Sequence, residues 1–357
     1  MWLLQGRFQC LHLLNLVLQL CKQDEGVVCQ PRPSREWPLL ESHHDQGRKL
    51  GAHRHRWRSR VEHQHELNPS RSVELLNSGN LVVKDGQGSV LWQSFGSPTD
   101  TLLPTQPITK NSMLVSGYYR FYFDNDNVLK LIYDGPEISS IYWPDPDKDV
   151  WNNLRTYYNS TRYGVLDEKG EFIASDRLAF NASDMGIGIL RRLTLDNDGN
   201  LRLYSLNNST GLWSVTWAAL SNICLIHGLC GKNGICLYTE SEACCSCPPN
   251  FEMADASDWR KGCKRNFNIN CDKPDELTFM ELPKTDFWGF DINVSNKVPL
   301  DSCKQLCVSD CNCLGIHYNC GTGKCYTKSL LFNGYNIRKL VGTTVPSSSE
   351  RRSDSGQ

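Results

Sequence analysis

The chain has 357 residues, a formal net charge of −1 and a sequence pI of about 6.7. This length predicts about two or three domains. The nearly neutral charge balance gives no overall field that would attract nucleic acid or an anionic membrane, so we expect no nucleic-acid partner. No apolar run reaches the roughly 18–20 residues that a membrane helix needs. The chain has 17 cysteines, 14 of them between Cys224 and Cys325, which indicates an oxidising compartment.

The first 21 residues, MWLLQGRFQCLHLLNLVLQLC, form a leucine-rich segment that contains one arginine. His12, Asn15 and Gln19 interrupt its apolar core. A secretory signal needs a basic start and a continuous apolar run. Residues 1–21 are therefore predicted to be a weak signal peptide.

Residues 22–71 have neither helical nor strand periodicity, although histidines lie among their arginines: His43, His44, His53, His55, His63 and His65. A metal-binding or nucleic-acid-binding arm is one interpretation, and a disordered tail is another. Translation in the wrong frame is a third. With free codon choice and a one-base shift, the run from Val28 to Pro69 can spell W-C-A-N-R-D-R-P, M-T-K-D-G-S-L and T-D-T-D-G-G-V-V-W. This text resembles the front half of a bulb-type lectin domain, so we favour an out-of-frame segment that binds no metal.

Two short strands are predicted at residues 79–83 and 89–92, joined by a glycine-rich turn at 84–88. The following WQSFGSPTDTLLP resembles the end of the bulb-type lectin domain of plant G-type lectin S-receptor-like serine/threonine-protein kinases. The resemblance continues to about residue 345 and implies a β-prism lectin remnant over residues 72–109. Such lectins bind mannose through Gln-x-Asp-x-Asn-x-Val-x-Tyr. The matching positions in this chain are Leu76, Ser78, Asn80, Val82 and Lys84. Only the asparagine and the valine of the pattern are kept, so we expect a structural hairpin without mannose binding.

Residues 110–220 predict further β-strands, at about 117–124, 127–134, 139–144, 199–205 and 211–217, with aromatic and polar residues alternating. The run from Asp198 to Tyr204 repeats the lectin hairpin pattern. Asp198, Asn200 and Tyr204 are candidate sugar-binding residues, although Asp196 replaces the glutamine and Arg202 the valine. A plain structural hairpin is the alternative. Residues 110–220 resemble the S-locus glycoprotein domain, which implies a second lectin-like unit.

Seven cysteines lie among glycines, prolines and polar residues at 221–264, six of them at the spacing of a module, in a segment too poor in apolar residues to fold on a core alone. Zinc is the competing interpretation, but the single residue between Cys245 and Cys247 is too few for common zinc geometry. The spacing resembles an EGF-like module. That resemblance implies the pairs Cys224–Cys236, Cys230–Cys245 and Cys247–Cys263, whereas the residues alone allow 15 connectivities. Cys244 is surplus, either a free thiol or a mispairing hazard.

Residues 268–345 contain a short predicted helix, with Asp301 or Ser302 as its N-cap and with Leu300, Cys303, Cys307 and Cys311 at helical spacing. Cys325 follows in Gly-Lys-Cys-Tyr. This pattern resembles the PAN/apple domain, a small α+β fold, which implies the pairs Cys303–Cys325 and Cys307–Cys313. Cys271 and Cys311 are a candidate third pair, and Cys320 is extra. Residues 346–357 are polar and serine-rich, and we expect a disordered tail.

Five N-glycosylation sequons support secretion: Asn159, Asn181, Asn207, Asn208 and Asn293. We find no P-loop, HExxH motif or serine nucleophile elbow, and Gly186-Ile-Gly188 lacks the other motifs of a kinase. Asp145, Asp147 and Asp149 alternate without the glycine and glutamate of a calcium loop, so a solvated turn is the better interpretation. We expect no catalytic residues, no metal and no cofactor.

The sequence therefore predicts a mainly β protein, with β-prism lectin-like units followed by disulfide-rich EGF-like and PAN/apple modules. The resemblance implies a secreted or truncated receptor ectodomain without the membrane span and kinase, and a plasma-membrane location for any full-length form. Its expected function is recognition of an extracellular glycan or peptide ligand, in pollen recognition or defence signalling. Other S-domain receptor kinases are candidate partners through the PAN region. The alternative is an incomplete gene model or pseudogene product of a receptor kinase.

Overall fold

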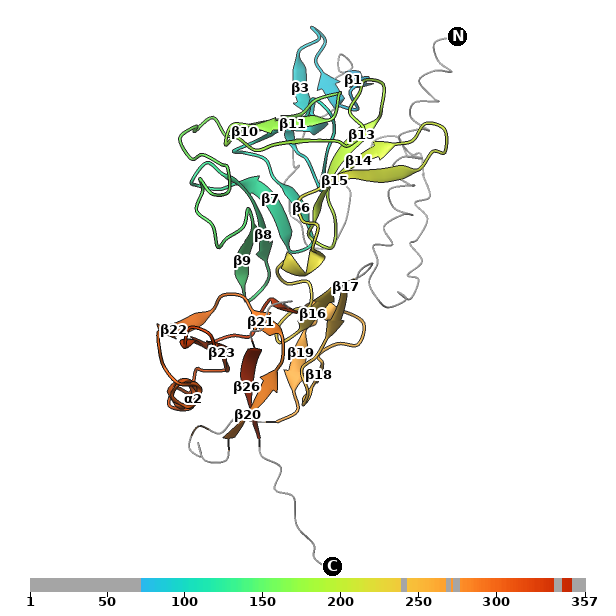
Figure 1. Cartoon of the computed structure of the whole chain (residues 1–357). Coiled ribbons are helices and arrows are strands. Elements are labelled where there is room, and N and C mark those ends of the chain that lie inside the picture. Colours follow the sequence, from blue (N-terminus) through green and yellow to red (C-terminus); the bar gives the residue numbers. More distant parts are fainter. Residues whose placement is uncertain (1–71, 239–242, 268–270, 272–276, 337–341, 349–357) are drawn as a thin grey trace, which may run out of the picture. The chain divides into compact units, whose positions relative to one another are not determined.

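The computed structural model describes residues 72–238, 243–267, 271, 277–336 and 342–348. The chain divides into two units, residues 30–96 and the remainder, which we describe separately. The described residues are mainly β-strand, which confirms the predicted fold class (Figure 1). Within them, no helix is long and apolar enough to cross a membrane. The predicted signal peptide, the out-of-frame segment and its histidines lie outside the described residues.

The described part of the first unit is a three-stranded antiparallel sheet in the order β1-β2-β3. Its strands are β1 (Ser72–Leu75), β2 (Leu81–Lys84) and β3 (Val90–Gln93), followed by a 3-10 turn at Ser94–Gly96. Val82 is buried, whereas most of the other large apolar side chains of the sheet are exposed. The valine kept from the mannose pattern therefore serves packing.

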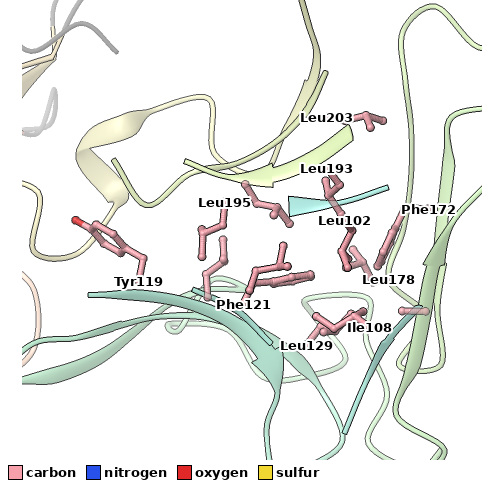
Figure 2. Packing of buried hydrophobic residues seen from close by; sticks show 14 of the residues in the cluster. Leu102, Ile108, Tyr119, Phe121, Leu129, Phe172, Leu178, Leu193, Leu195 and Leu203 are labelled. Atoms are coloured by element: carbon pink, nitrogen blue, oxygen red, sulfur yellow. The ribbon is translucent and has the colours of Figure 1, made fainter. Parts of the chain in front are cut away.

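Three four-stranded antiparallel sheets form the second lectin-like region, in the orders β6-β7-β8-β9, β12-β11-β10-β5 and β15-β14-β13-β4. This region begins at Thr101, before the expected start at residue 110, because β4 and β5 pair with β13 and β10. The strands are β4 (Thr101–Leu102), β5 (Pro107–Thr109), β6 (Leu114–Ser116), β7 (Tyr119–Phe123), β8 (Leu129–Asp134), β9 (Ser139–Trp143), β10 (Tyr163–Leu166), β11 (Glu171–Ala174), β12 (Ala179–Asn181), β13 (Arg191–Leu195), β14 (Leu201–Leu206) and β15 (Trp213–Ala218). Alternate residues of β7 and β8 are buried. Because each strand turns one face inward, all three sheets contribute to a single apolar core (Figure 2).

One turn recurs in both lectin-like regions. Its first residue accepts a backbone bond from the residue three positions later and donates one to the carbonyl of the residue four positions later. The turns are Leu76–Asn80, Asp85–Ser89, Asp124–Val128, Asp167–Glu171 and Asp196–Asn200. The fourth residue always has positive φ, and it is glycine in every turn except at Asn127. These residue types suit the left-handed conformation, which explains why the Asp-x-x-Gly pattern marks the hairpins.

The cysteine-rich region contains two larger sheets and a hairpin, in the orders β17-β16-β25-β21, β20-β26-β23-β24-β22 and β18-β19. Its elements are a 3-10 turn at Ile223–Leu225, β16 (Ile235–Tyr238), β17 (Ala243–Ser246), β18 (Phe251–Met253), a 3-10 turn at Trp259–Lys261, β19 (Cys263–Arg265), β20 (Leu277–Leu282), β21 (Thr285–Phe287), β22 (Asp291–Ser295), α2 (Leu300–Val308), β23 (Gly315–Asn319), β24 (Lys324–Lys328), β25 (Gly334–Asn336) and β26 (Gly342–Ser348). Strand β25 pairs in parallel with β16. One sheet therefore joins the expected EGF-like and PAN-like segments.

Three local expectations need correction. Helix α2 begins at Leu300 with Pro299 as its N-cap, so neither Asp301 nor Ser302 is the cap. Cys311 lies beyond the end of this helix, because α2 stops at Val308. Strand β26 extends to Ser348, three residues into the segment that we expected to be a tail, and residues 349–357 lie outside the described part.

The cysteine-rich and second lectin-like regions share core contacts within their unit. Ile226 and Phe332 belong to the same apolar cluster as the three sheets. The Phe332 ring lies 5.4 Å from that of Tyr133. The amide N–H of Gly228 donates to Asn333 Oδ1 at 2.9 Å.

Candidate functional site

The hairpin that joins β13 to β14 carries the candidate sugar-binding residues, and its charged side chains bond to one another. Arg202 Nη2 donates to Asp198 Oδ2 at 2.6 Å, and Arg202 Nη1 donates to Asp196 Oδ2 at 2.5 Å. Tyr204 Oη donates to the same Asp196 oxygen at 2.7 Å. Arg202, which replaces the valine of the mannose pattern, therefore forms ion pairs with the carboxylates of both Asp196 and Asp198.

Burial and charge shift the pKa values in this network. Burial raises the pKa of Asp196, and the attraction and hydrogen bonds of Arg202 offset this rise only in part. Burial also raises the pKa of Tyr204, and the neighbouring Asp196 charge adds to the rise. Burial favours a lower pKa for Arg202, but Asp198 and Asp196 outweigh it and raise the value. Both Arg202 and Tyr204 thus keep their protons at neutral pH.

Asn200, the third candidate, serves the fold. It is 2% exposed. Its Nδ2 donates to the Leu220 carbonyl at 2.8 Å, and its Oδ1 accepts from the Leu220 N–H at 3.1 Å. Asn80 has the same role in the first unit, where Nδ2 donates to Gln93 and Oδ1 accepts from the Phe95 N–H. Sugar binding by Asp198, Asn200 and Tyr204 stays a prediction, in a hairpin whose polar groups already have protein partners.

Large apolar side chains are exposed along the loop that precedes β13 and along the β14–β15 hairpin. A backbone bond from Leu206 N–H to the Leu190 carbonyl, at 2.9 Å, joins the end of the loop to the hairpin. Within the hairpin, Asn207 N–H donates to the Leu212 carbonyl at 2.9 Å. We call this set the apolar strip; it consists of Met185, Ile187, Leu190, Leu212 and Val215, each at least 47% exposed. Exposed apolar groups on a folded domain commonly mark contact surfaces.

A second exposed feature is an aromatic cluster of Trp151, Tyr157 and Tyr158. The Trp151 ring lies 5.6 Å from each tyrosine ring, and the two tyrosine rings are 4.5 Å apart. Tyr158 is 73% exposed. Exposed aromatic rings offer apolar faces that stack on sugars or on other rings.

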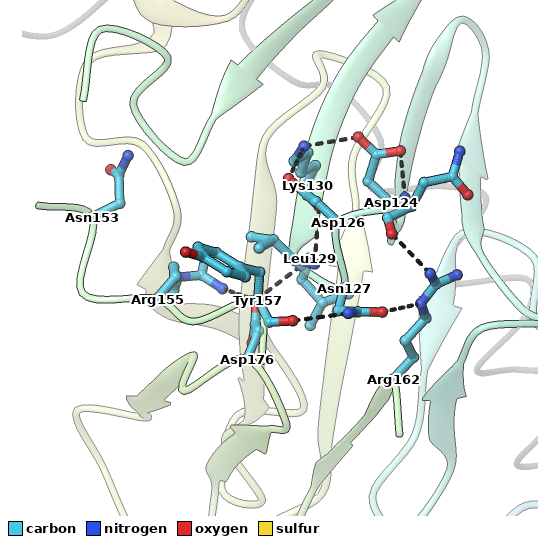
Figure 3. A network of polar contacts seen from close by, with 12 residues as sticks. Asp124, Asp126, Asn127, Leu129, Lys130, Asn153, Arg155, Tyr157, Arg162 and Asp176 are labelled. Carbon is cyan, nitrogen blue, oxygen red and sulfur yellow. Dashed lines mark hydrogen bonds and ion pairs between the residues drawn. The ribbon is translucent and has the colours of Figure 1, made fainter. Parts of the chain in front are cut away.

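The loop that bears this cluster is held in place by polar contacts (Figure 3). Asn127 Nδ2 donates to the Tyr157 carbonyl at 2.8 Å, and Arg162 Nε donates to Asn127 Oδ1 at 2.7 Å. Arg155 and Asp176 form an ion pair at 2.5 Å, with side chains that are 4% and 0% exposed. The loop is therefore anchored to the sheets beneath it. Sequence reasoning missed this anchor, because neither residue stands in a recognisable motif.

The other acidic and histidine candidates have separate partners. Asp145 pairs with Lys148, Asp147 Oδ1 accepts from Trp288 Nε1 at 3.0 Å, and Asp149 bonds Asn152. These contacts suit the predicted turn. Across the described ranges, no group of three or more His, Cys, Asp or Glu residues is placed to hold a metal.

Each of the two single histidines contacts a partner. His227 is buried, and its Nδ1 lies 2.7 Å from Ser140 Oγ. Burial lowers the pKa of His227 to about 3. His317 Nδ1 lies 3.0 Å from Asp286 Oδ1.

Among the residues that the structure describes, six disulfides join pairs of cysteines within the cysteine-rich region, with Cα–Cα distances of 5.2–5.8 Å. The structure brings together the cysteines that the family resemblance pairs, including the candidate third bridge: Cys224–Cys236, Cys230–Cys245, Cys247–Cys263, Cys271–Cys311, Cys303–Cys325 and Cys307–Cys313. Cys244, which the sequence left as a surplus thiol, is disulfide-bonded. Cys320 is free and exposed in the described part of the chain.

All five sequon asparagines are exposed: Asn159, Asn181, Asn207, Asn208 and Asn293. They lie in loops or on β12 and β22, so an attached glycan at any of them would not displace core residues.

Comparison with known proteins gives two domain matches. Residues 48–119 match the D-mannose binding lectin family, and residues 158–255 match the S-locus glycoprotein domain. Residues 48–71 of the first match lie outside the described residues. Neither matched domain is catalytic.

Similar curated proteins are receptor kinases of plants. A receptor protein kinase of Zea mays is 49% identical over 73% of this chain and 33% of its own length. G-type lectin S-receptor-like serine/threonine-protein kinases of Arabidopsis thaliana and of indica rice are 28% and 31% identical, over 77% and 76% of this chain and 34% and 38% of their own lengths. The chain thus spans about a third of the length of these relatives.

Among solved structures, a monomeric mannose-binding lectin from Gastrodia elata is 20% identical, with a TM-score of 0.27, over 34% of this chain and 96% of its own. The sequence matches place this chain among homologues of the G-type lectin S-receptor-like kinases.

Proposed function

We propose that this homologue of the G-type lectin S-receptor-like kinases is a non-catalytic extracellular recognition module that binds a macromolecular ligand, protein or glycan, through exposed apolar side chains. The observation that carries the proposal is the apolar strip. Polar groups at the lectin hairpin are bonded within the protein, whereas Ile187, Leu190 and Leu212 are exposed by more than half. Oxidised disulfides outside the cytosol would stabilise the cysteine-rich region, whose Ile226 and Phe332 pack in the same apolar core as the lectin-like sheets.

Two further features support a binding role. The strip lies on a loop and a hairpin attached to a closed core, and such loops commonly carry recognition residues. Relatives of this chain are described as receptor kinases, which suits a ligand-binding part that works together with a kinase. Pollen recognition and defence signalling are the roles that we propose for such a receptor.

The test uses the full chain secreted from a eukaryotic host and applied to a glycan array and to a panel of S-domain ectodomains from the same plant family. For any ligand found, Ile187→Asp should weaken binding by about tenfold or more, because burying one isoleucine contributes roughly 1.5–3 kcal/mol. Leu154→Asp is the matched control, since Leu154 is 81% exposed and lies outside the strip. Equal losses in both variants, or no binding on either panel, would count against the proposal.

A further inference from the structure

The aromatic cluster contains a glycosylation sequon within its own loop. Asn159-Ser160-Thr161 directly follows Tyr157 and Tyr158. Asn159 Oδ1 accepts from Thr161 Oγ1 at 2.8 Å and from the Thr161 N–H at 3.1 Å. Both bonds use the oxygen of the amide, so they leave the attachment atom Nδ2 uninvolved, and Asn159 is an exposed residue.

An aromatic residue two positions before the asparagine distinguishes this sequon from the other four. The corresponding residues are Tyr157 here, and Ala179, Ser205, Leu206 and Asp291 before Asn181, Asn207, Asn208 and Asn293. Tyr157 is held by the Asn127 bond to its carbonyl, and the Tyr158 N–H donates to Thr156 Oγ1 at 3.3 Å. The backbone between the rings and Asn159 is therefore fixed.

We propose that Asn159 carries an N-linked glycan whose first sugar packs on the Tyr157 and Tyr158 rings, so that the chain covers its own aromatic cluster. A pyranose ring has an apolar face of C–H groups, which complements the electron-rich face of an aromatic ring. Because the sugar is attached to the same short loop, stacking costs little additional ordering. The aromatic cluster then serves the stability of the loop, and ligand contact falls to other surfaces.

The modification joins Asn159 Nδ2 to the anomeric carbon of an oligosaccharide carried on a lipid diphosphate. The bond from that carbon to the diphosphate breaks, the diphosphate leaves with the electron pair, and the amide loses one proton. This step requires entry into the secretory pathway, so the inference rests on the extracellular location in the proposed function. Glycan occupancy at the other sequons tests that location separately.

The experiment uses the full chain secreted with high-mannose glycans and compares two enzymes that remove these glycans to different extents. Endoglycosidase H leaves the first sugar on each asparagine, whereas peptide-N-glycosidase F removes it. Hydroxyl-radical footprinting should show Trp151, Tyr157 and Tyr158 protected before treatment and after endoglycosidase H, and more reactive after peptide-N-glycosidase F. Exposed Tyr163, which lies outside the cluster, provides the internal reference.

A variant series gives the second measurement. Asn159→Gln should lower Tm by about 2–4 °C, the size expected for losing one aromatic stacking contact in a domain of this length. The same substitution should have little effect in a Tyr157→Ser/Tyr158→Ser background, because the sugar then has no ring to contact. Asn293→Gln is the matched control, with an exposed sequon and no aromatic residue two positions earlier.

Glycopeptide mass spectrometry separates the outcomes. Glycans at other sequons with none at Asn159, or an unchanged footprint after removal of the first sugar, would overturn the inference and leave the proposed function standing. If no sequon is occupied in the secretory host, the extracellular location fails together with the inference.

Discussion

Replacing Asp176 by asparagine tests the buried anchor of the aromatic loop. Asp176 is fully buried, and it accepts from Arg155, from the Leu129 N–H at 2.8 Å and from the Leu178 N–H at 3.0 Å. Burial lowers the pKa of Arg155, and Asp176 only partly restores it. Asp176→Asn would leave the Arg155 charge buried without its counter-ion.

Removing one partner of a buried ion pair typically costs about 3–5 kcal/mol. At roughly 2–4 °C per kcal/mol for a domain of 150–250 residues, the expected fall in Tm is about 6–20 °C. The exposed pair of Arg120 and Asp134, whose side chains are 37% and 34% exposed, provides the control. Asp134→Asn should cost about 0–1 kcal/mol, because solvent screens that pair.

Differential scanning calorimetry of the secreted chain measures both variants. A third variant, Arg155→Met with Asp176→Asn, removes the charge as well and should recover part of the lost stability. Similar Tm values for Asp176→Asn and Asp134→Asn would refute the view that this pair anchors the loop.

Two further predictions concern pH and sulfur. The folded-state pKa of His227 is about 3, below its ordinary value of 6.5, so its contribution to stability is complete above pH 6.5 and falls as the pH drops toward 3. Between these two values the free energy of unfolding should fall by about 1.4 kcal/mol for each pH unit. Urea titrations from pH 7 to 4 should show a weaker pH dependence in His227→Phe than in the unmodified chain. The same pH dependence in both proteins would contradict this. Replacing Cys303 and Cys325 together by alanine should cost about 2–5 kcal/mol, because their bridge links α2 to β24. Cys320→Ser, at an exposed free thiol, should stay within about 0.5 kcal/mol in the same urea assay.

Local features of this fold could be predicted from the sequence. The strands expected near residues 127–134 and 139–144 correspond to β8 and β9. The pattern of an aspartate followed three residues later by glycine or asparagine marks turns for two reasons. Glycine and asparagine adopt positive φ readily, and the aspartate side chain accepts from the N–H groups that follow it, as Asp167 Oδ1 does from Lys169 and Glu171. Both signals lie within a few residues of the chain.

Long-range polar pairs could not be predicted in this way. Asp176 bonds Leu129, 47 residues earlier, and Asn200 bonds Leu220, 20 residues later. Such contacts depend on how the sheets close around the core. Pairing of the cysteines was also open from spacing alone, and only the family resemblance selected among the alternatives.

Asn80 and Asn200 show why a partly kept motif is weak support for a sugar site. Each follows the same turn and uses its amide to hold a later backbone group, Phe95 N–H in one case and Leu220 in the other. The fold requires this asparagine whether or not a sugar binds, so its presence does not discriminate between the two roles. At the second hairpin Asp196 and Arg202 replace the glutamine and valine of the pattern, and Arg202 forms ion pairs with both Asp196 and Asp198. The hairpin chemistry therefore stabilises the lectin-like fold, which is why we place ligand contact on the apolar strip.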